Sequence, residues 1–154
     1  MKVLVVEDRF DNAVVALQFF KEKGIEAEVI GTANNAKKKL EKEAYLGAII
    51  DVEIPQAIGE TPQVLGPGVG ELAKELGTPH VYLTGGYFHH GPQAKVFVDE
   101  FCLEQDEGNM VPDKTDLGAW EAAWDVLRSL GNLEEIYESR VRYQKFTGEM
   151  YRRA

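Results

Sequence analysis

Acidic side chains follow two apolar runs of the chain, at the positions where each run ends. Glu7 and Asp8 follow residues 3–6, and Asp51 follows residues 46–50. If these runs form neighbouring parallel strands, three carboxylates meet at one edge of a sheet. Their mutual repulsion makes that arrangement costly unless a cation or a proton lies among them. The pattern therefore indicates phosphoryl or metal chemistry.

Composition and charge narrow the class of protein. A chain of 154 residues, with 44% hydrophobic and 28% charged residues, is typical of one globular domain. Its net charge of −9 argues against unspecific binding to nucleic acid or to acidic membranes. The lone Cys102 forms no internal disulfide, and we find neither a signal peptide nor an apolar stretch of membrane-spanning length. We expect a soluble, cytoplasmic protein.

Apolar runs alternate with amphipathic segments, which predicts an α/β protein with a parallel sheet covered by helices on both faces. The first helix is expected to begin at Asp11 or Asn12 and to pack through Val14, Leu17 and Phe20. The strands are predicted at residues 2–7, 26–30, 46–51, 80–84 and 109–111. The helices are predicted up to residue 23, over 34–43, 71–76 and 116–130, and from 133 to about 152.

Two segments are harder to assign. Residues 52–70 contain three prolines and four glycines, which predicts a long loop that is not regular throughout. Residues 93–103 carry Ala94, Val96 and Phe101 in a pattern that suits a buried helix or a strand. We predict a helix there, because a parallel strand should be followed by a crossover.

Thr84 follows the predicted fourth strand, and Lys114 follows the fifth. With these residues in order, and with Pro55 four residues after Asp51, the chain resembles a response-regulator receiver domain, the phospho-accepting module of two-component signalling. The resemblance implies a (βα)5 doubly wound, flavodoxin-like fold. It covers residues 1–130, so residues 131–154 are expected to form a C-terminal helical extension.

The resemblance also implies a role for each acidic residue. Asp51 matches the phospho-acceptor, and a carboxylate is a competent nucleophile for forming an acyl phosphate. Glu7 and Asp8 match the acidic pair that holds Mg²⁺. Asp51 and the backbone carbonyl of Glu53 would be the other protein ligands of the ion, which prefers oxygen donors.

Two further residues complete the set that the resemblance implies. Thr84 matches the switch hydroxyl, which donates a hydrogen bond once the phosphoryl group arrives. Lys114 matches the lysine that contacts the phosphoryl oxygens. The chain departs from the family where Thr115 replaces a proline after this lysine and where Val111 replaces a common aromatic residue. These departures indicate a divergent receiver.

Other motifs around the expected site have competing interpretations. The glycine-rich segment 66–70 precedes a helix, but it lacks the Gly-Lys-Ser/Thr ending of a P-loop, so a lid or partner-binding loop is favoured over a nucleotide site. His89 and His90, with Cys102 or Glu104, are candidate metal ligands. A polar loop is the simpler interpretation of that pair, because adjacent histidines lack the spacing of two ligands on one helix face.

The last predicted helix carries an apolar stripe. Ile136, Tyr143 and Met150 recur at seven-residue intervals, with Phe146 between the last two. The stripe docks either on its own domain or on a partner, and a homodimer through this helix is one form of the second alternative.

The leading hypothesis is a stand-alone receiver-like protein that accepts a phosphoryl group on Asp51 and depends on Mg²⁺. A histidine kinase or a small phosphodonor would supply the group, and an unidentified output protein would read the change; no nucleic-acid or membrane partner is expected. Any enzymatic activity would be limited to its own phosphorylation and dephosphorylation. Two alternatives remain: a pseudo-receiver scaffold without phosphotransfer, and a phosphate-ester enzyme that uses His89 or His90 as acid or base.

Overall fold

The computed structural model describes residues 1–85, 93–98 and 109–153. Its centre is a six-stranded sheet in the order β2-β1-β3-β6-β7-β8, and a separate two-stranded ribbon pairs β4 with β5. The strands are β1 (Lys2–Val6), β2 (Glu26–Ile30), β3 (Gly47–Ile50), β4 (Glu53–Ile54), β5 (Gln63–Val64), β6 (His80–Thr84), β7 (Ala94–Val98) and β8 (Met110–Val111). The helices are α1 (Phe10–Glu22), α2 (Ala33–Lys42), α3 (Gly66–Glu75), α4 (Leu117–Ser129) and α5 (Leu133–Arg153).

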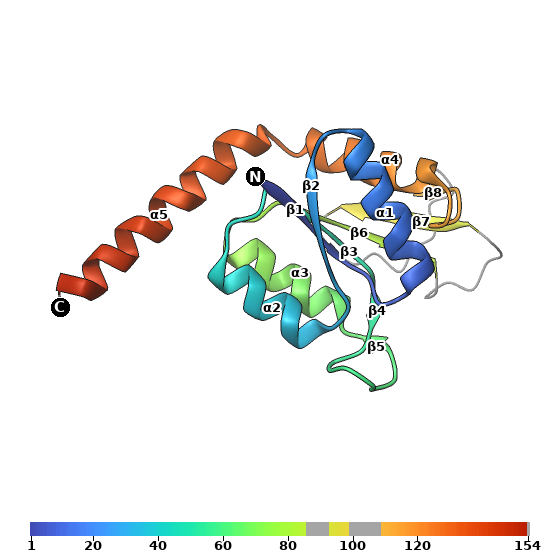
Figure 1. The fold of residues 1–154 in the computed structure, drawn as a ribbon, viewed down its shortest axis with the longest axis horizontal. Helices are drawn as coiled ribbons and strands as arrows, with labels where there is room; N and C mark the ends of the chain where they lie inside the picture. Colours follow the sequence, from blue (N-terminus) through green and yellow to red (C-terminus); the bar gives the residue numbers. More distant parts are fainter. Residues whose placement is uncertain (86–92, 99–108, 154) are drawn as a thin grey trace.

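Strands β2, β1, β3 and β6 are parallel, and alternate residues of β1 enter the two halves of the core. Helices α1 and α4 cover one face of the sheet, and α2 and α3 cover the other (Figure 1). Val3 and Val5 of β1 pack in the first cluster, and Leu4 and Val6 pack in the second. Burial on both faces explains why these strands read as continuous apolar runs.

The predicted α/β class and the flavodoxin-like order of the parallel strands are confirmed. The prediction of a helix at residues 93–103 is wrong over the part that the structure describes, because residues 94–98 form strand β7. This strand runs antiparallel to β6, and β8 runs antiparallel to β7. A hairpin partner needs no helical crossover, so the argument for a helix did not apply.

Two reversals of direction leave β8 parallel to β6. The carboxyl end of β8 therefore points to the same edge of the sheet as the carboxyl ends of β1 and β3. Lys114 follows β8 by three residues and reaches that edge. The fold thus keeps the predicted position of the lysine although the element before it differs from the (βα)5 pattern.

The expectation of a long irregular loop before a helix at residues 71–76 also needs correction. Strands β4 and β5 form a hairpin, and α3 begins at Gly66, five residues earlier than predicted. The hairpin holds the start of α2, since the carbonyl of Pro55 accepts a hydrogen bond from the amide of Ala33. A Cβ atom added at Gly66 would lie 2.0 Å from the carbonyl oxygen of Asp51. Glycine therefore allows α3 to start directly against the end of β3.

Helix α1 differs from its prediction in start and in orientation. It begins at Phe10, and its N-cap residue, Arg9, makes no side-chain capping bond. The buried face contains Ala16, Phe19 and Phe20, whereas Val14 and Leu17 are 44% and 43% exposed. Asn12, which was expected to cap the helix, is buried within it.

Helix α5 comes after α4 in the chain, and it extends away from the sheet toward the C-terminus (Figure 1). The helices predicted at residues 34–43 and 116–130 are found within two residues of their bounds, capped by Thr32 and Asp116. The boundary between a domain at 1–130 and an extension at 131–154 stays a prediction. Among the described residues, no helix has the length and apolar character needed to cross a membrane.

The close approach of α3 to β3 predicts opposite outcomes for two neighbouring glycines. Gly66→Ala should destabilise the protein by about 1–3 kcal/mol, because its Cβ would collide with the Asp51 backbone. Gly68→Ala is the matched control, since its Cβ would meet only the end of the Lys37 side chain at 3.6 Å. We expect no loss there, because alanine favours a helix over glycine. Urea unfolding checks both; equal midpoints for the two variants would contradict this packing.

Candidate functional site

The candidate site lies at the carboxyl ends of β1 and β3, where the chain order across the sheet reverses. The chain runs from β1 to β2 on one side and later places β3 on the other side. A crevice forms outside such a point in open α/β sheets. Carboxylate oxygens of Glu7, Asp8 and Asp51 lie within 4.8 Å of one another there. The predicted convergence of three acids from two strands is thus present in the structure.

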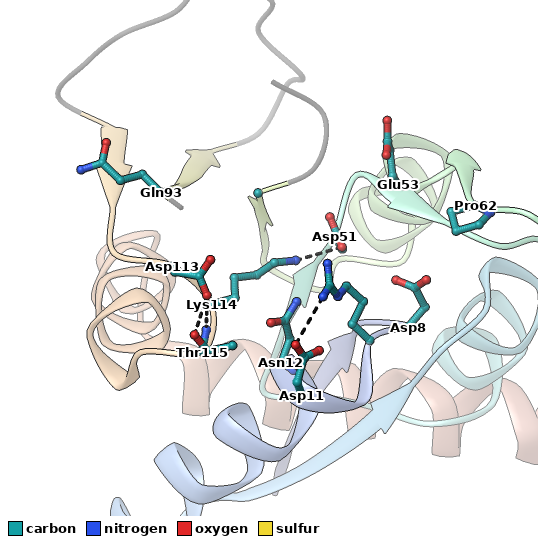
Figure 2. A pocket seen from close by; sticks show the side chains of 12 residues that line it. Asp8, Asp11, Asn12, Asp51, Glu53, Pro62, Gln93, Asp113, Lys114 and Thr115 are labelled. Carbon is teal, nitrogen blue, oxygen red and sulfur yellow. Dashed lines mark hydrogen bonds and ion pairs between the residues drawn. The ribbon is translucent and has the colours of Figure 1, made fainter. Parts of the chain in front are cut away.

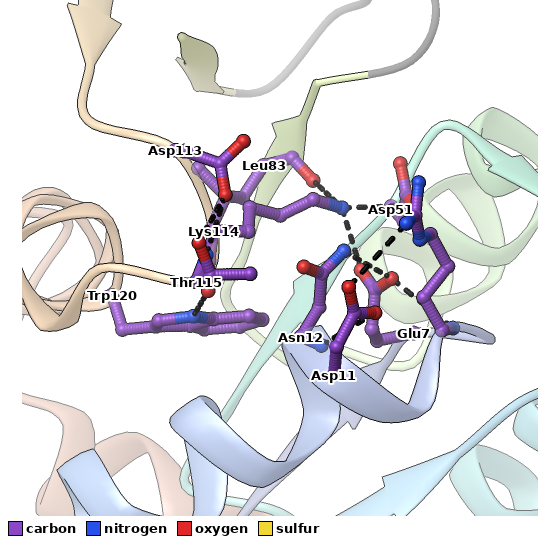
Figure 3. Close-up of polar contacts among 10 residues, drawn as sticks. Glu7, Asp11, Asn12, Asp51, Leu83, Asp113, Lys114, Thr115 and Trp120 are labelled. Atoms are coloured by element: carbon purple, nitrogen blue, oxygen red, sulfur yellow. Dashed lines mark hydrogen bonds and ion pairs between the residues drawn. The ribbon is translucent and has the colours of Figure 1, made fainter. Parts of the chain in front are cut away.

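A buried lysine lies between two of these acids. The ammonium nitrogen Nζ of Lys114 is 2.5 Å from Oε2 of Glu7 and 2.9 Å from Oδ2 of Asp51 (Figure 3). It also donates to the carbonyl oxygen of Leu83 at 3.4 Å. Lys114 therefore brings positive charge to the end of β1, the end of β3 and the end of β6 at once.

Glu7 has a partner on each carboxylate oxygen. The second oxygen, Oε1, accepts hydrogen bonds from the side-chain amide of Asn12 at 3.0 Å and from the backbone amide of Arg9 at 3.3 Å. Burial raises the pKa of Glu7 to about 7, against the opposing effect of the Lys114 charge and together with the charge of Asp51. Near neutral pH this carboxyl group therefore exchanges a proton.

The pKa values of Lys114 and Asp8 are also shifted by the neighbouring charges. Burial alone would lower the pKa of Lys114, but the charges of Asp51 and Glu7, with their hydrogen bonds, outweigh it and raise that pKa. Lys114 is therefore charged at neutral pH. Burial and the charge of Asp51 raise the pKa of Asp8. The three acids thus hold more negative charge than one lysine neutralises.

Two buried oxygen atoms at this edge have no hydrogen-bond partner among the described residues. One is Oδ1 of Asp51, and the other is Oγ1 of Thr84, the last residue of β6. A buried polar atom without a partner costs free energy, so such atoms are uncommon without a functional reason. Each is an available contact for a ligand that enters the site.

Two of the three acids, Asp8 and Asp51, open onto a cavity of about 630 Å³ (Figure 2). Asp8, Asp51, Glu53 and Lys114 all line it. Glu53 is the first residue of β4, and its side chain points away from Asp51 in this view. The predicted role of its backbone carbonyl as a metal ligand stays a prediction.

The donor set fits a hard divalent cation. The site offers oxygen atoms from three carboxylates, and Oδ1 of Asp51 is buried with no described partner. Mg²⁺ is commonly bound by one or two carboxylates together with waters and phosphate oxygens. Because both oxygens of Glu7 already accept hydrogen bonds, Asp8 and Asp51 are the better placed direct ligands.

Sequence reasoning missed two residues that hold the site together. Asn12 was one of two candidates for the start of the first helix, yet its side chain donates to Glu7. Trp120 is a buried residue of α4, and its indole Nε1 donates to the backbone carbonyl of Lys114 at 2.8 Å. The position of Asn12, five residues after Glu7 and inside the helix that follows the first strand, was the available indication.

Several other predicted motifs do not enter the described site. The glycine-rich segment 66–70 is the start of α3, and Gly66 and Gly70 are required there by close packing against Asp51 and Tyr82. His89 and His90, together with Cys102 and Glu104, lie outside the described residues. The metal and acid–base roles considered for them stay predictions.

Comparison with known proteins identifies similar structures. A receiver domain protein described as CheY-like, from Methanospirillum hungatei, aligns over 94% of this chain and 96% of its own, with 20% identity and a TM-score of 0.48. The receiver domain of a putative LuxO repressor protein from Vibrio parahaemolyticus aligns over 56% of this chain, with 20% identity and a TM-score of 0.44. The receiver domain of NtrC4 from Aquifex aeolicus aligns over 59% of this chain and 69% of its own, with 23% identity and a TM-score of 0.42.

The alignment spans 64% of the Vibrio domain, which is less than two thirds of that chain. No family model and no curated protein matches the sequence. Identities of 20–23% with TM-scores below 0.5 transfer no residue roles. The geometry of the site itself is therefore the basis for a functional proposal.

The raised pKa of Glu7 predicts a pH dependence of stability in metal-free buffer. From about pH 4.5 to about pH 7 the native protein keeps a proton on Glu7 that the unfolded chain has released. This contribution to stability is fully present below the pKa that Glu7 has in the unfolded chain, and it is lost as pH rises through the pKa that Glu7 has in the folded protein. The total change in the free energy of unfolding is on the order of 3 kcal/mol. Glu7→Gln should flatten this part of the profile in urea unfolding with EDTA. Glu60→Gln, at an exposed glutamate, should keep the wild-type slope; an unchanged slope in Glu7→Gln would contradict the assignment.

The buried ion pairs predict a second effect on stability. Lys114→Met should destabilise the protein at pH 7.5 by about 3–5 kcal/mol, because Glu7 and Asp51 lose their shared cation while buried. Adding Glu7→Gln to Lys114→Met should recover part of that loss. A double-mutant cycle by urea unfolding measures the coupling. Strictly additive effects would show that the pair contributes nothing to the folded state.

Proposed function

We propose that this chain is a receiver-like protein that accepts a phosphoryl group on Asp51 in a Mg²⁺-dependent reaction. One observation carries the proposal: acids from β1 and β3 lie within 4.8 Å of one another beside a buried lysine, at the carboxyl edge of a parallel sheet. The unpartnered Oδ1 of Asp51 supports Asp51 as the nucleophile. Asp8 and the Glu53 carbonyl would complete the direct ligands of the proposed metal site, and Glu7 would add negative charge beside them.

The proposed reaction transfers the phosphoryl group from a small phosphodonor or a phosphohistidine. An Asp51 oxygen forms a bond to phosphorus while the bond from phosphorus to the leaving group breaks, which leaves an aspartyl phosphate and the released donor. Bound Mg²⁺ would supply positive charge for the incoming phosphoryl group. Lys114 is close enough to Asp51 to pair with the product, and Glu7 would then remain hydrogen-bonded to Asn12.

Thr84 would report the change to the rest of the protein. Its hydroxyl is fully buried and has no partner among the described residues, so an added phosphoryl oxygen offers it a first hydrogen bond. Thr84 is paired across the sheet with Lys95 of β7. Movement of Thr84 would therefore be transmitted to β7, and the output partner would recognise that altered surface.

A second candidate is a scaffold that binds partners without phosphotransfer. The observation that favours it is the same lysine, because Lys114 compensates part of the acidic charge with no metal present. In that case Asp51 would be a structural residue. Phosphorylation chemistry separates the two candidates directly.

The test is incubation of the purified protein with acetyl phosphate and Mg²⁺, followed by intact mass measurement. We expect the gain of one phosphoryl group, its loss in Asp51→Asn, and its dependence on the metal. Asp11→Asn is the matched control, since Asp11 lines the same cavity but lies outside the carboxylate cluster. No gain in wild type, while a known receiver reacts under the same conditions, would support the scaffold instead.

Tryptophan fluorescence gives an independent readout of the same site. Trp120 is bonded to the backbone of Lys114, so a ligand that contacts Lys114 should change its emission. Trp124→Phe leaves Trp120 as the remaining tryptophan of the chain. We expect beryllofluoride with Mg²⁺ to change the signal in this variant, and Asp51→Asn to abolish that change.

A further inference from the structure

Helix α5 presents an exposed aromatic surface next to segregated charge. Tyr143 and Phe146 are 59% and 60% exposed, and within residues 133–148 Leu133 is the one side chain in the buried class. Glu135 and Arg142 are exposed on the same side of the helix, two turns apart. Two large aromatic side chains beside a matched acid and base are typical of an interface.

The charges of this helix are ordered along its axis. Its first turns carry three acidic residues, and the following two turns carry three basic residues: Glu134, Glu135 and Glu138, then Arg140, Arg142 and Lys145. A surface with this order is complementary to itself when turned end to end. It repels itself when two copies lie in the same direction.

We propose that α5 pairs with α5 of a second copy of this chain in antiparallel orientation, a property independent of the phosphoryl acceptance proposed above. In this arrangement Glu135 of each copy faces Arg142 of the other, so each dimer contains the ion pair twice. The opposed helix dipoles add to the attraction. A parallel pair would place the acidic turns level with each other and the basic turns level with each other.

In the antiparallel register, Tyr143 of each copy can pack against the partner molecule. When residues 135 and 142 are level, Tyr143 of one copy lies beside the first turns of the partner helix. An open cleft of about 590 Å³ borders those turns and is lined in part by Leu76, Ile136 and Tyr143. Side chains of a helix lean toward its N-terminus, which directs the incoming Tyr143 toward Ile136 and this cleft.

Charge reversal tests the pairing and its direction together. Sedimentation equilibrium of the full chain should show a dimer, and Glu135→Arg or Arg142→Glu should each weaken it about tenfold, because two attractive pairs become repulsive. The double variant Glu135→Arg/Arg142→Glu should restore the wild-type dimer. In a parallel pair the new arginine at position 135 would approach Arg140 of the other copy, so the double variant would stay weak.

Cross-linking gives the register without relying on affinity. With the native Cys102 replaced by serine, Ser139→Cys should form a disulfide-linked dimer, since position 139 lies near the two-fold axis. Lys145→Cys should not, because the two copies of position 145 would be separated by 13 residues of helix, about 20 Å. The reverse result would overturn the antiparallel register.

The aromatic side chains are tested with a matched control. Tyr143→Ser/Phe146→Ser should give a monomer, with its circular dichroism spectrum unchanged because both residues are exposed. Ile58→Ser removes an apolar side chain that is even more exposed, at 86%, from the hairpin between β4 and β5, and should leave the dimer intact. A wild-type monomer at about 100 μM, or a dimer lost in Ile58→Ser and kept in the α5 variant, would overturn the proposal.

Discussion

A single lysine makes the acidic edge of the sheet compatible with folding. Glu7 and Asp51 are buried at the ends of neighbouring strands, and without Lys114 their repulsion would act in a region of low dielectric constant. The lysine does not neutralise the whole cluster, since Asp8 adds a third carboxylate. That residual negative charge favours a cation or a proton in the pocket.

The site residues that could be located from the sequence are polar residues at the ends of buried strands. Strands buried on both faces read as continuous apolar runs, and the polar residue that ends such a run lies at the edge of the sheet. Glu7, Asp51 and Thr84 were found in this way. Lys114 was placed at the same edge because it follows a predicted fifth strand, which has only two residues in the structure, and the family resemblance supplied its expected role.

The features that escaped prediction depend on tertiary contacts. The apolar pattern of residues 94–98 fits a helix and a strand equally well, and the pairing with β6 decides between them. Gly66 and Pro67 suggest a loop in isolation, but the contact with the Asp51 backbone makes glycine the residue that permits a helix start there. Asn12 looks like a cap until Glu7 is known to lie within hydrogen-bonding distance. Only the Asn12 contact had a local indication, its separation of five residues from Glu7, and the other two features depend on contacts between segments farther apart in the sequence.

The pairing between Glu7 and Lys114 joins residues 107 positions apart in the sequence. A nascent chain could complete the four parallel strands, which end at Thr84, while Lys114 was still inside the ribosome. During that interval the two buried acids would lack their counter-charge, so protons or ions from the surroundings would have to take its place. Closing so long a loop is also slow. On this route the charge balance of the pocket would be among the last features that the domain acquires.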